Sequence, residues 1–447
     1  MGSGAPIRRA GQLSIRLPGS LPAVTGTFLH AATCSAAGRA CGLFCTPVSS
    51  GFMRLRPPGM SSMRETDTVR KTSWPGRALL AAAFVLAIAG AWLRPAPVWE
   101  FDVPPLGNAT GLSEPAFMRT VLDLRGEGRT LHSPSILRGD GAAVLWFEGS
   151  REAARDVQIM SVRLVGEHLS PEQPAPLLSP EGASRVMRPR QAVLVLGNTI
   201  GNVAGDGGQL LSTVVSVGGW AAASVADVRL KGGHPVSARK LALSPFLNRS
   251  GLVRNATARF ADGDIAVPAY FELGNAFGLL VRLDKSGRVR ATARIGNGQV
   301  AIQPALVVTG RKTALAFLRP FDGSRRLFRS ETRDGGRTWS APAPVADIPN
   351  PNAPVSVLRL RGGTLLMAFN DSAKRADDMT LALSHDDGRS WKRTFRFEVP
   401  GRENPDIYRY PDLARLQDGS FLLTYSTFAK GGIRAHHFNE AWLAAHE

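Results

Sequence analysis

The feature that most constrains this 447-residue chain is an eight-residue pattern that occurs twice near the C-terminus. The two copies begin at Thr332 and Ser384, 52 residues apart, and share the form Ser/Thr-x-Asp-x-Gly-x-Ser/Thr-Trp. Hydroxyl and carboxylate side chains bond nearby backbone N–H groups, glycine takes the positive φ, and tryptophan packs under the turn, so each copy predicts a tight hairpin. The interval is the length of one blade of a β-propeller. We therefore interpret the pattern as part of the fold rather than as catalytic machinery.

Longer segments repeat at the same interval, each with a strand, a glycine turn and a second strand. The second strands of the last three copies contain Phe317, Phe369 and Tyr425, which lie 52 and 56 residues apart. Two weaker copies lie between the first copy and the second. Six copies predict an all-β fold, a six-bladed β-propeller of four-stranded antiparallel blades over residues 119–447. The prolines that begin the clear copies are Pro134, Pro304, Pro354 and Pro411.

These prolines predict where the candidate site lies. Proline is tolerated at the first residue of a strand, where its missing N–H falls at the end of the ladder, so each should mark the entry of an innermost strand. In an antiparallel blade the start of the first strand and the end of the second share one rim. Polar residues gathered there around a central channel would form a ligand pocket. The expected rim residues are His132, Gln303, Asn352, Tyr410, Glu148, Arg151, Glu272, Arg319, Asn370 and Asp371.

The N-terminal part has a different character. Residues 1–62 are rich in Gly, Pro, Ser and Ala without clear periodicity and carry all three cysteines, so we expect them to be disordered or absent from the natural product. Residues 63–94 combine a basic flank with an apolar run and are interpreted as a signal peptide or signal anchor. We expect export to the periplasmic face of the inner membrane, or secretion if the signal is cleaved. Residues 95–118 are rich in proline and are expected to be a linker.

Charge and motifs exclude several classes of function. The net charge is +18, but after the N-terminal part the basic residues are scattered among acidic ones and no nucleic-acid-binding module is visible, so nucleic acid is not an expected partner. No metal, P-loop or dinucleotide motif appears, so neither a metal nor a cofactor is expected. The surplus of arginine suits an acidic saccharide, because arginine binds carboxylates well. We expect a monomer that contacts the membrane only through its N-terminal anchor.

With the repeats and the rim in hand, residues 120–440 resemble the sialidase (neuraminidase) superfamily, whose Asp-box repeats match the two hairpins. The closest resemblance is to the bacterial sialidase-like Asp-box, or BNR-repeat, proteins. It implies a tyrosine nucleophile, an aspartate acid/base and three arginines around the substrate carboxylate. Matched onto this chain, the nucleophile falls on Tyr410 and the acid/base on Asp156, which follows Arg151 at the family's spacing. The second and third arginines fall on Arg319 and, offset by about one residue, on Arg375, and Arg151 is expected to help them hold the carboxylate.

The chain departs from the family pattern at two positions. The first arginine of the family is matched by His132-Ser133-Pro134, which makes His132 a candidate acid or base. The glutamate that assists the tyrosine is matched by Gln303, and an amide cannot accept a proton as a carboxylate does. Glu272, on a neighbouring repeat, is the candidate to replace it. Trp220 follows two glycines and is either a platform for a sugar ring or a structural plug.

The leading hypothesis is an exported sialidase-like glycosidase that acts on an acidic glycan. The alternatives are a carbohydrate-binding propeller that has lost hydrolysis, a glycosidase for a different acidic sugar, and a protein-interaction propeller. Plainer interpretations also stand: Glu148 and Asp156 could be solvated turn carboxylates, and Arg375 part of a solvated loop. The firmest site prediction is Arg319, which should project into the channel mouth and meet Arg151 and either Glu272 or Asp371.

Overall fold

The computed structural model describes nine ranges of the chain. Residues 78–86 form an exposed helix, which falls in the expected export signal. Residues 1–62 and the rest of the signal lie outside the described residues. Among the helices that are described, none combines the length and the apolar character needed to cross a membrane. The described ranges are 78–86, 97–103, 115–139, 141–204, 207–243, 251–272, 276–296, 301–398 and 407–447.

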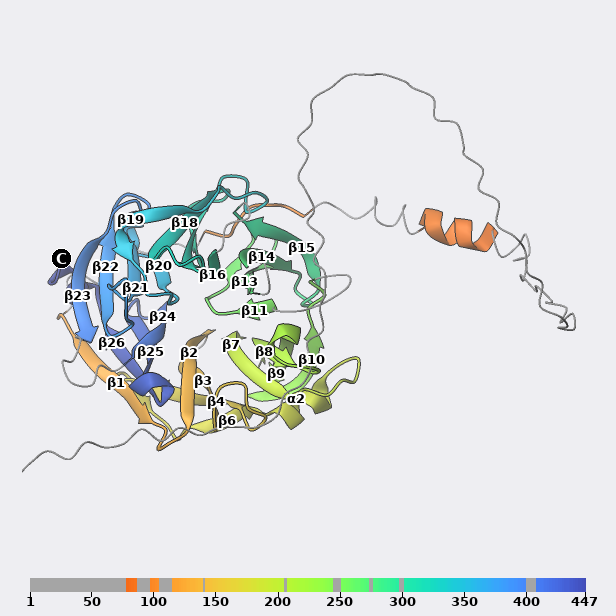
Figure 1. The fold of residues 1–447 in the computed structure, drawn as a ribbon, viewed down its shortest axis with the longest axis horizontal. Helices are drawn as coiled ribbons and strands as arrows, with labels where there is room; N and C mark the ends of the chain where they lie inside the picture. Colours follow the sequence, from red (N-terminus) through yellow and green to blue (C-terminus); the bar gives the residue numbers. More distant parts are fainter. Residues whose placement is uncertain are drawn as a thin grey trace, which may run out of the picture. The chain divides into compact units, whose positions relative to one another are not determined.

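The strands among the remaining described residues form four sheets (Figure 1). Two sheets have four strands each. One contains β20 (Ser356–Arg359), β21 (Leu365–Phe369), β22 (Met379–Ser384) and β23 (Lys392–Glu398). The other contains β24 (Arg409–Arg415), β25 (Phe421–Thr427), β26 (Gly432–Phe438) and β1 (Met118–Arg125). Because β1 pairs antiparallel with β26, the first strand of the chain completes the last sheet.

The other two sheets have nine strands each, and each consists of two antiparallel groups joined by a short parallel contact. The first comprises β2 (Thr130–Gly139), β3 (Ala142–Gly149), β4 (Gln158–Val165), β5 (Ser170–Pro171) and β6 (Ala175–Leu178), then β7 (Val195–Ala204), β8 (Gly207–Val215), β9 (Ser224–Lys231) and β10 (His234–Lys240). The second comprises β11 (Gly251–Val253), β12 (Ala258–Arg259), β13 (Ile265–Phe271), β14 (Phe277–Leu283) and β15 (Val289–Ile295), then β16 (Ala301–Val308), β17 (Ala314–Pro320), β18 (Arg326–Thr332) and β19 (Ala343–Pro349).

Helical turns are few and short. Ser179 caps α2 by accepting a hydrogen bond from the N–H of Gly182, and Asn439 caps α3 in the same way through Trp442. Apart from the helix at residues 78–86, the helical segments described are α2 (Pro180–Val186), α3 (Glu440–Ala444), η2 (Trp220–Ala222), η3 (Arg361–Gly363) and η4 (Phe428–Lys430). The prediction of an all-β fold is confirmed. The strand pairing by itself does not confirm six blades, because two pairs of expected blades share a sheet.

Hydrophobic clusters lie between consecutive groups of strands. For example, Phe317 of β17 packs with Phe369 of β21, and Leu145 of β3 packs with Leu210 of β8. One cluster, which includes Leu422 of β25, joins the last group of strands to the first. Successive side chains of a strand point to opposite faces, and nearly all of those of β3 and β21 are buried, so both faces of these sheets pack against neighbouring sheets. The innermost strands consequently surround a common axis (Figure 1).

The two predicted hairpins are confirmed and are nearly identical. Each connects a third strand to a fourth strand, β18 to β19 and β22 to β23. In the first hairpin the Thr332 hydroxyl accepts from the N–H of Gly336 at 2.9 Å, and the Trp339 indole N–H donates to the Gly336 carbonyl at 3.1 Å. In the second the equivalent distances are 2.8 and 3.2 Å.

The first hairpin also receives part of the segment that the sequence placed in a linker. Gly335 has a φ of 77°, and a Cβ atom there would lie 1.8 Å from the carbonyl oxygen of Trp99. Phe101 is only 1% exposed and stacks on Phe260 with 5.1 Å between ring centroids. Residues 97–103 are therefore packed against the sheet.

Candidate functional site

The innermost strands are distorted where they enter the rim. The register slips between His132 and Ser135 in β2, between Ile302 and Ala305 in β16, and between Arg409 and Asp412 in β24. Bulges re-aim side chains and occur often beside active sites. The prolines at these places lie inside the bulges rather than at the first residue of each strand, which corrects the expectation for Pro134, Pro304 and Pro411; Pro354 lies just before β20. Positive φ angles accompany this distortion at Ser133 (53°), Gln303 (52°), Asn352 (63°) and Tyr410 (59°).

The bulges of β2 and β24 bring His132 against Tyr410. The two rings meet edge to face with 4.5 Å between centroids. His132 is 1% exposed, and its Nδ1 lies 2.8 Å from the Ser426 hydroxyl, while Nε2 has no hydrogen-bond partner among the described residues. Burial lowers the pKa of His132 well below its usual value, and nearby positive charges, that of Lys430 first, lower the pKa further. His132 is therefore a neutral imidazole beside the predicted nucleophile.

Arg254 reaches Tyr410 from the opposite side of the rim. It follows β11, is buried, and donates from Nη2 to the carbonyl oxygens of Tyr410 and Pro411. Its guanidinium carbon lies 5.1 Å from the centroid of the Tyr410 ring, within the range of a cation–π contact. Burial lowers the pKa of Arg254. The sequence analysis missed this residue, because the repeat that carries it has neither a leading proline nor an Asp-box hairpin to fix its register.

Arg319 lies at the rim that was predicted for it. Its Nε donates to the side-chain oxygen of Asn352 at 2.6 Å, and its Nη1 donates to that of Gln303 at 3.0 Å. The amide nitrogen of Gln303 in turn donates to the hydroxyl of Tyr270 at 3.1 Å. The expected contacts of Arg319 with Arg151 and with Glu272 or Asp371 are not formed. Neutral amides hold the guanidinium instead, because the second strand of the repeat ends next to the bulge that carries Gln303.

Arg409 completes the cluster of cations. Burial and the nearby charge of Arg319 both lower the pKa of Arg409, so the two guanidinium groups lie close enough to repel. Arg254, Arg319 and Arg409 form no ion pair with any carboxylate in the described part of the chain. Arg254 and Arg319 donate instead to carbonyl and amide groups. We call the cluster the tyrosine end of the channel. It comprises His132, Arg254, Tyr270, Gln303, Arg319, Arg409 and Tyr410.

A separate cavity of about 580 Å³ adjoins the tyrosine end, and Arg151, Asp156 and Trp220 line it. The Trp220 indole N–H donates to Glu272 at 3.4 Å, which links the cavity to the strand that carries Tyr270. The Asp156 carboxylate accepts from the hydroxyl and the N–H of Ser150, at 2.9 and 2.8 Å, and these bonds lower the pKa of Asp156. Asp156 is therefore an ionised carboxylate at neutral pH.

Trp220 and the apolar floor of this cavity fit a flat ligand. Trp220 is 37% exposed, and its ring lies over Gly197, where a Cβ atom would come within 3.5 Å of it. Val195 and Val215 line the cavity and also belong to the hydrophobic cluster that contains Tyr270. The exposed indole face beside polar groups is the arrangement expected of a sugar platform.

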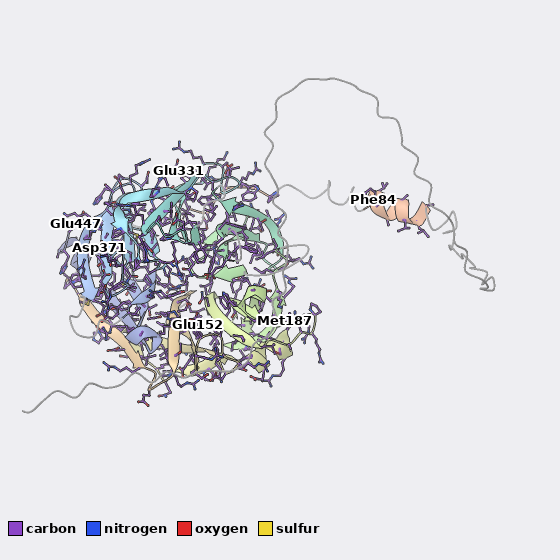
Figure 2. The ribbon with its side chains drawn as sticks, viewed as in Figure 1. Phe84, Glu152, Met187, Glu331, Asp371 and Glu447 are labelled. Carbon is purple, nitrogen blue, oxygen red and sulfur yellow. The ribbon has the colours of Figure 1, made fainter. Side chains whose placement is uncertain are left out.

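Three predicted site residues are engaged elsewhere. Arg375 has a side chain that is 57% exposed and pairs with Asp377 at 3.3 Å. Asp371 pairs with Arg393 and Arg396 of β23 at 2.9 and 3.2 Å, away from the central axis (Figure 2). The third, Glu148, pairs with Arg129 at 2.9 Å. Within the described ranges, no group of three or more His, Cys, Asp and Glu side chains is arranged to hold a metal ion.

The fold agrees with those of several solved structures. A protein of unknown function from Dyadobacter fermentans aligns with a TM-score of 0.58 at 14% identity, covering 72% of this chain and 99% of that one. The Trypanosoma rangeli sialidase in complex with the inhibitor DANA aligns with a TM-score of 0.55 at 12% identity, covering 73% of this chain and 60% of that one. The Hadza microbial sialidase Hz136 aligns with a TM-score of 0.55 at 13% identity, covering 70% of this chain and 66% of that one. At these identities the likeness shows the fold alone.

Comparison by sequence is more specific. No curated protein matches this chain in sequence. The family model described as the BNR repeat-like domain matches residues 141–423, which is more than half of the chain and includes both Asp-box hairpins and most of the candidate site. The chain therefore belongs to the BNR repeat-like domain family.

Proposed function

We propose that the protein is a sialidase-like glycoside hydrolase whose tyrosine end binds the carboxylate of an acidic glycan. The observation that carries the proposal is the convergence of Arg254, Arg319 and Arg409 around Tyr410 without a paired carboxylate. Buried or half-buried guanidinium groups that lie this close repel one another, and an anion placed between them would relieve that repulsion. Each also retains N–H groups that a carboxylate could accept from.

The proposed reaction uses Tyr410 as the nucleophile. A neutral hydroxyl approaches a carboxylated sugar without charge repulsion, and a neighbouring base must take its proton. Gln303 cannot take up that proton, because a neutral amide is not a base; its side chain instead accepts from Arg319 and donates to Tyr270. His132 is the proposed acceptor, since it lies against the Tyr410 ring, is held neutral, and has an unpartnered Nε2 among the described residues.

Asp156 and Glu272 are proposed for proton transfer to the leaving group, with Arg151 and Trp220 binding the rest of the glycan in the adjoining cavity. Because the bonds from Ser150 lower the pKa of Asp156, this side chain is protonated only at acidic pH. Hydrolysis that uses Asp156 as the acid should therefore be fastest under acidic conditions.

The direct test is hydrolysis of fluorogenic sialosides and uronosides by the purified full-length chain. Tyr410→Phe should lower kcat at least ~1000-fold, because it removes the nucleophile. Tyr408→Phe is the matched control, since Tyr408 precedes β24 and packs against Tyr425 with 6.1 Å between ring centroids. Equal activity of both variants and of the unmodified protein would contradict the role of Tyr410.

Gln303 favours a second candidate, a carbohydrate-binding protein that has lost hydrolysis. In that case the full-length chain should bind sialylated or uronic-acid glycans on an array and release no sugar. Release of sugar that depends on Tyr410 would exclude this candidate. Binding that is equal for acidic glycans and their neutral analogues would contradict both candidates.

We also propose that the chain forms six blades, is monomeric, and is exported with an uncleaved anchor. The blade count is supported by six groups of strands whose hydrophobic clusters link each group to the next and the last to the first. Export is supported by the basic flank and apolar run in residues 63–94. Cell fractionation tests the location, and light scattering tests the oligomeric state. A cytoplasmic protein or a stable dimer would overturn the respective proposal.

A further inference from the structure

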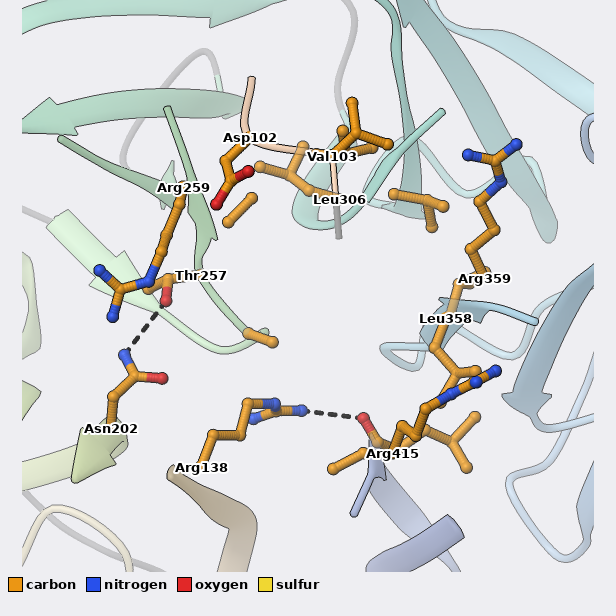
Figure 3. A pocket seen from close by; sticks show the side chains of 17 residues that line it. Asp102, Val103, Arg138, Asn202, Thr257, Arg259, Leu306, Leu358, Arg359 and Arg415 are labelled. Atoms are coloured by element: carbon orange, nitrogen blue, oxygen red, sulfur yellow. Dashed lines mark hydrogen bonds between the residues drawn. The ribbon is translucent and has the colours of Figure 1, made fainter. Parts of the chain in front are cut away.

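The central channel has a second cavity, at the other end of the innermost strands (Figure 3). Its volume is about 390 Å³, and all six central strand segments contribute to its lining. On β24 the lining includes Arg415, five residues after Tyr410, and on β2 it includes Arg138, six residues after His132. At about 3.3 Å per residue the two ends are separated by ~16–20 Å. The cavity is therefore distinct from the tyrosine end.

Arginines from four different strands line this second cavity, and we call it the four-arginine end. They are Arg138, Arg259, Arg359 and Arg415, and the one carboxylate among the lining residues is Asp102. Arg138 is balanced by Asp412, which it contacts at 2.8 Å. Burial lowers the pKa of Arg415, and the charge of nearby Glu440, which also pairs with Arg361 at 3.5 Å, opposes that shift, so Arg415 is not counted as available to a ligand. The two arginines that are counted are Arg259 and Arg359, beside the single carboxylate of Asp102.

Two of the arginines offer donors to a ligand. Arg359 donates from Nη1 to the Thr309 carbonyl at 3.0 Å, but its buried Nε has no hydrogen-bond partner among the described residues. A buried donor without a partner is costly, so a ligand that accepts from it would be stabilised. Arg259 is exposed at the mouth, where its own backbone carbonyl accepts from the N–H of Asp102.

The same cavity has an apolar wall. Leu306 and Val308 of β16, and Leu358 of β20, line it between the arginines. A bare inorganic ion would leave this wall in contact with water, whereas an organic anion would cover it. The combination therefore fits a small molecule that has both an anionic head and an apolar body.

We propose that the four-arginine end binds a small organic dianion, of the aryl or alkyl phosphate class, independently of the site for the acidic glycan. The guanidinium groups of Arg259 and Arg359 lie on different strands and can each pair with one negative charge, which favours a dianion over a monoanion, and arginine offers paired donors to the oxygens of a phosphate. Nothing in this proposal depends on hydrolysis at the tyrosine end.

Isothermal titration of the full-length chain with phenyl phosphate at pH 7.5 tests the proposal, because the phosphate is then mostly dianionic. Phenyl sulfate, a monoanion of similar shape, should bind at least ~10-fold more weakly, and phenol and inorganic phosphate should each bind more weakly than phenyl phosphate. Rising salt should weaken binding of phenyl phosphate. Absence of binding, or equal binding of phenol, would overturn the proposal.

Substitutions should move the affinity in opposite directions. Arg259→Gln and Arg359→Gln should each weaken binding of phenyl phosphate about 10-fold, through the loss of one charge-assisted contact. Asp102→Asn should strengthen it, because it removes the competing negative charge. Arg163→Gln is the matched control, since Arg163 of β4 is not among the residues that line this cavity, has a side chain that is 73% exposed, and pairs with Glu172 at 3.7 Å.

Thermal melting of each variant shows whether it is folded. An affinity that is unchanged in Arg259→Gln, Arg359→Gln and Asp102→Asn would place phenyl phosphate elsewhere and overturn the proposal. Sugar hydrolysis should be the same in Arg259→Gln as in the unmodified protein, so failure at this end is distinguishable from failure at the tyrosine end.

Discussion

The two ends of the central channel are both rich in arginine, but the arginines are held in different ways. At the tyrosine end Arg254 and Arg319 donate to backbone carbonyls and side-chain amides, and neither forms an ion pair within the described residues. Burial lowers the pKa of Arg254, and the charge of Asp412 only partly opposes that shift. Within the channel, Arg138 is bound by the buried carboxylate of Asp412. The difference teaches that proximity of arginines alone does not mark a carboxylate site. What supports the proposed site is that its arginines form no ion pair with an internal carboxylate among the described residues.

Backbone geometry separates the two ends as well. The tyrosine end has bulges and positive φ angles, whereas the other end of β24 pairs regularly with β25 from Asp412 to Arg415. Strained backbone persists where the surrounding structure holds it, commonly at functional sites. Arg254 helps to stabilise this backbone, because it donates hydrogen bonds to two consecutive carbonyl groups at the bulge of β24.

Asp412→Asn should have the largest effect on stability, because Asp412 lies on β24 between the two ends. The change leaves Arg138 without its counter-charge and should lower the free energy of unfolding by ~3–5 kcal/mol, measured by urea denaturation. Glu172→Gln removes an exposed pair at 3.7 Å and should cost less than ~0.5 kcal/mol. Equal effects of the two variants would show that the Arg138–Asp412 pair does not hold the ends together.

A pH titration should distinguish the ends next, because the tyrosine end contains a buried histidine and the four-arginine end is lined by none. The pKa of His132 is lowered on folding, so the unfolded chain binds the proton more tightly and protonation favours unfolding. The contribution of His132 to the free energy of unfolding is therefore fully present above pH ~6.5. It is lost as the pH falls, by up to ~1.4 kcal/mol per pH unit for one such histidine.

His436 and His437 contribute in the same direction, since burial lowers the pKa of His436 to about 3 and also lowers that of His437. His132→Gln should therefore reduce the slope of stability against pH between pH 6 and 4 without removing it. Urea denaturation at several pH values measures the slope. An unchanged slope in His132→Gln would mean that His132 is not held neutral.

Particular residues explain how much of this could be read from the sequence. The Asp-box hairpins were predictable because their hydrogen bonds join residues two to four apart. Arg319 was predictable because it ends an apolar strand next to such a hairpin. Arg254 was not, because its partner Tyr410 lies 156 residues away and the contact exists only once the ring of sheets has formed. The pairing of Arg138 with Asp412 spans 274 residues and was missed for the same reason.

Arg375 shows the opposite error. The resemblance assigned it to the carboxylate clamp through a loop whose register was uncertain by one residue, whereas Arg409, adjacent to Tyr410, occupies the cluster. Arg375→Ala should therefore have the smallest effect: activity within about twofold and the free energy of unfolding within ~0.5 kcal/mol of the unmodified protein. Kinetics with a fluorogenic sialoside and urea denaturation measure these. A large loss of activity in Arg375→Ala would show that Arg375 does contribute to the site.

The most direct test of the central claim is the affinity of Arg319→Ala for an acidic sugar compared with its methyl ester. Removing one charge-assisted contact should weaken binding of the free acid ~10–100-fold and barely change binding of the ester, as measured by isothermal titration. Arg359→Gln, at the other end of the channel, should leave both affinities unchanged. Equal losses for the acid and the ester, or no loss in Arg319→Ala, would contradict the assignment of the tyrosine end as the carboxylate site.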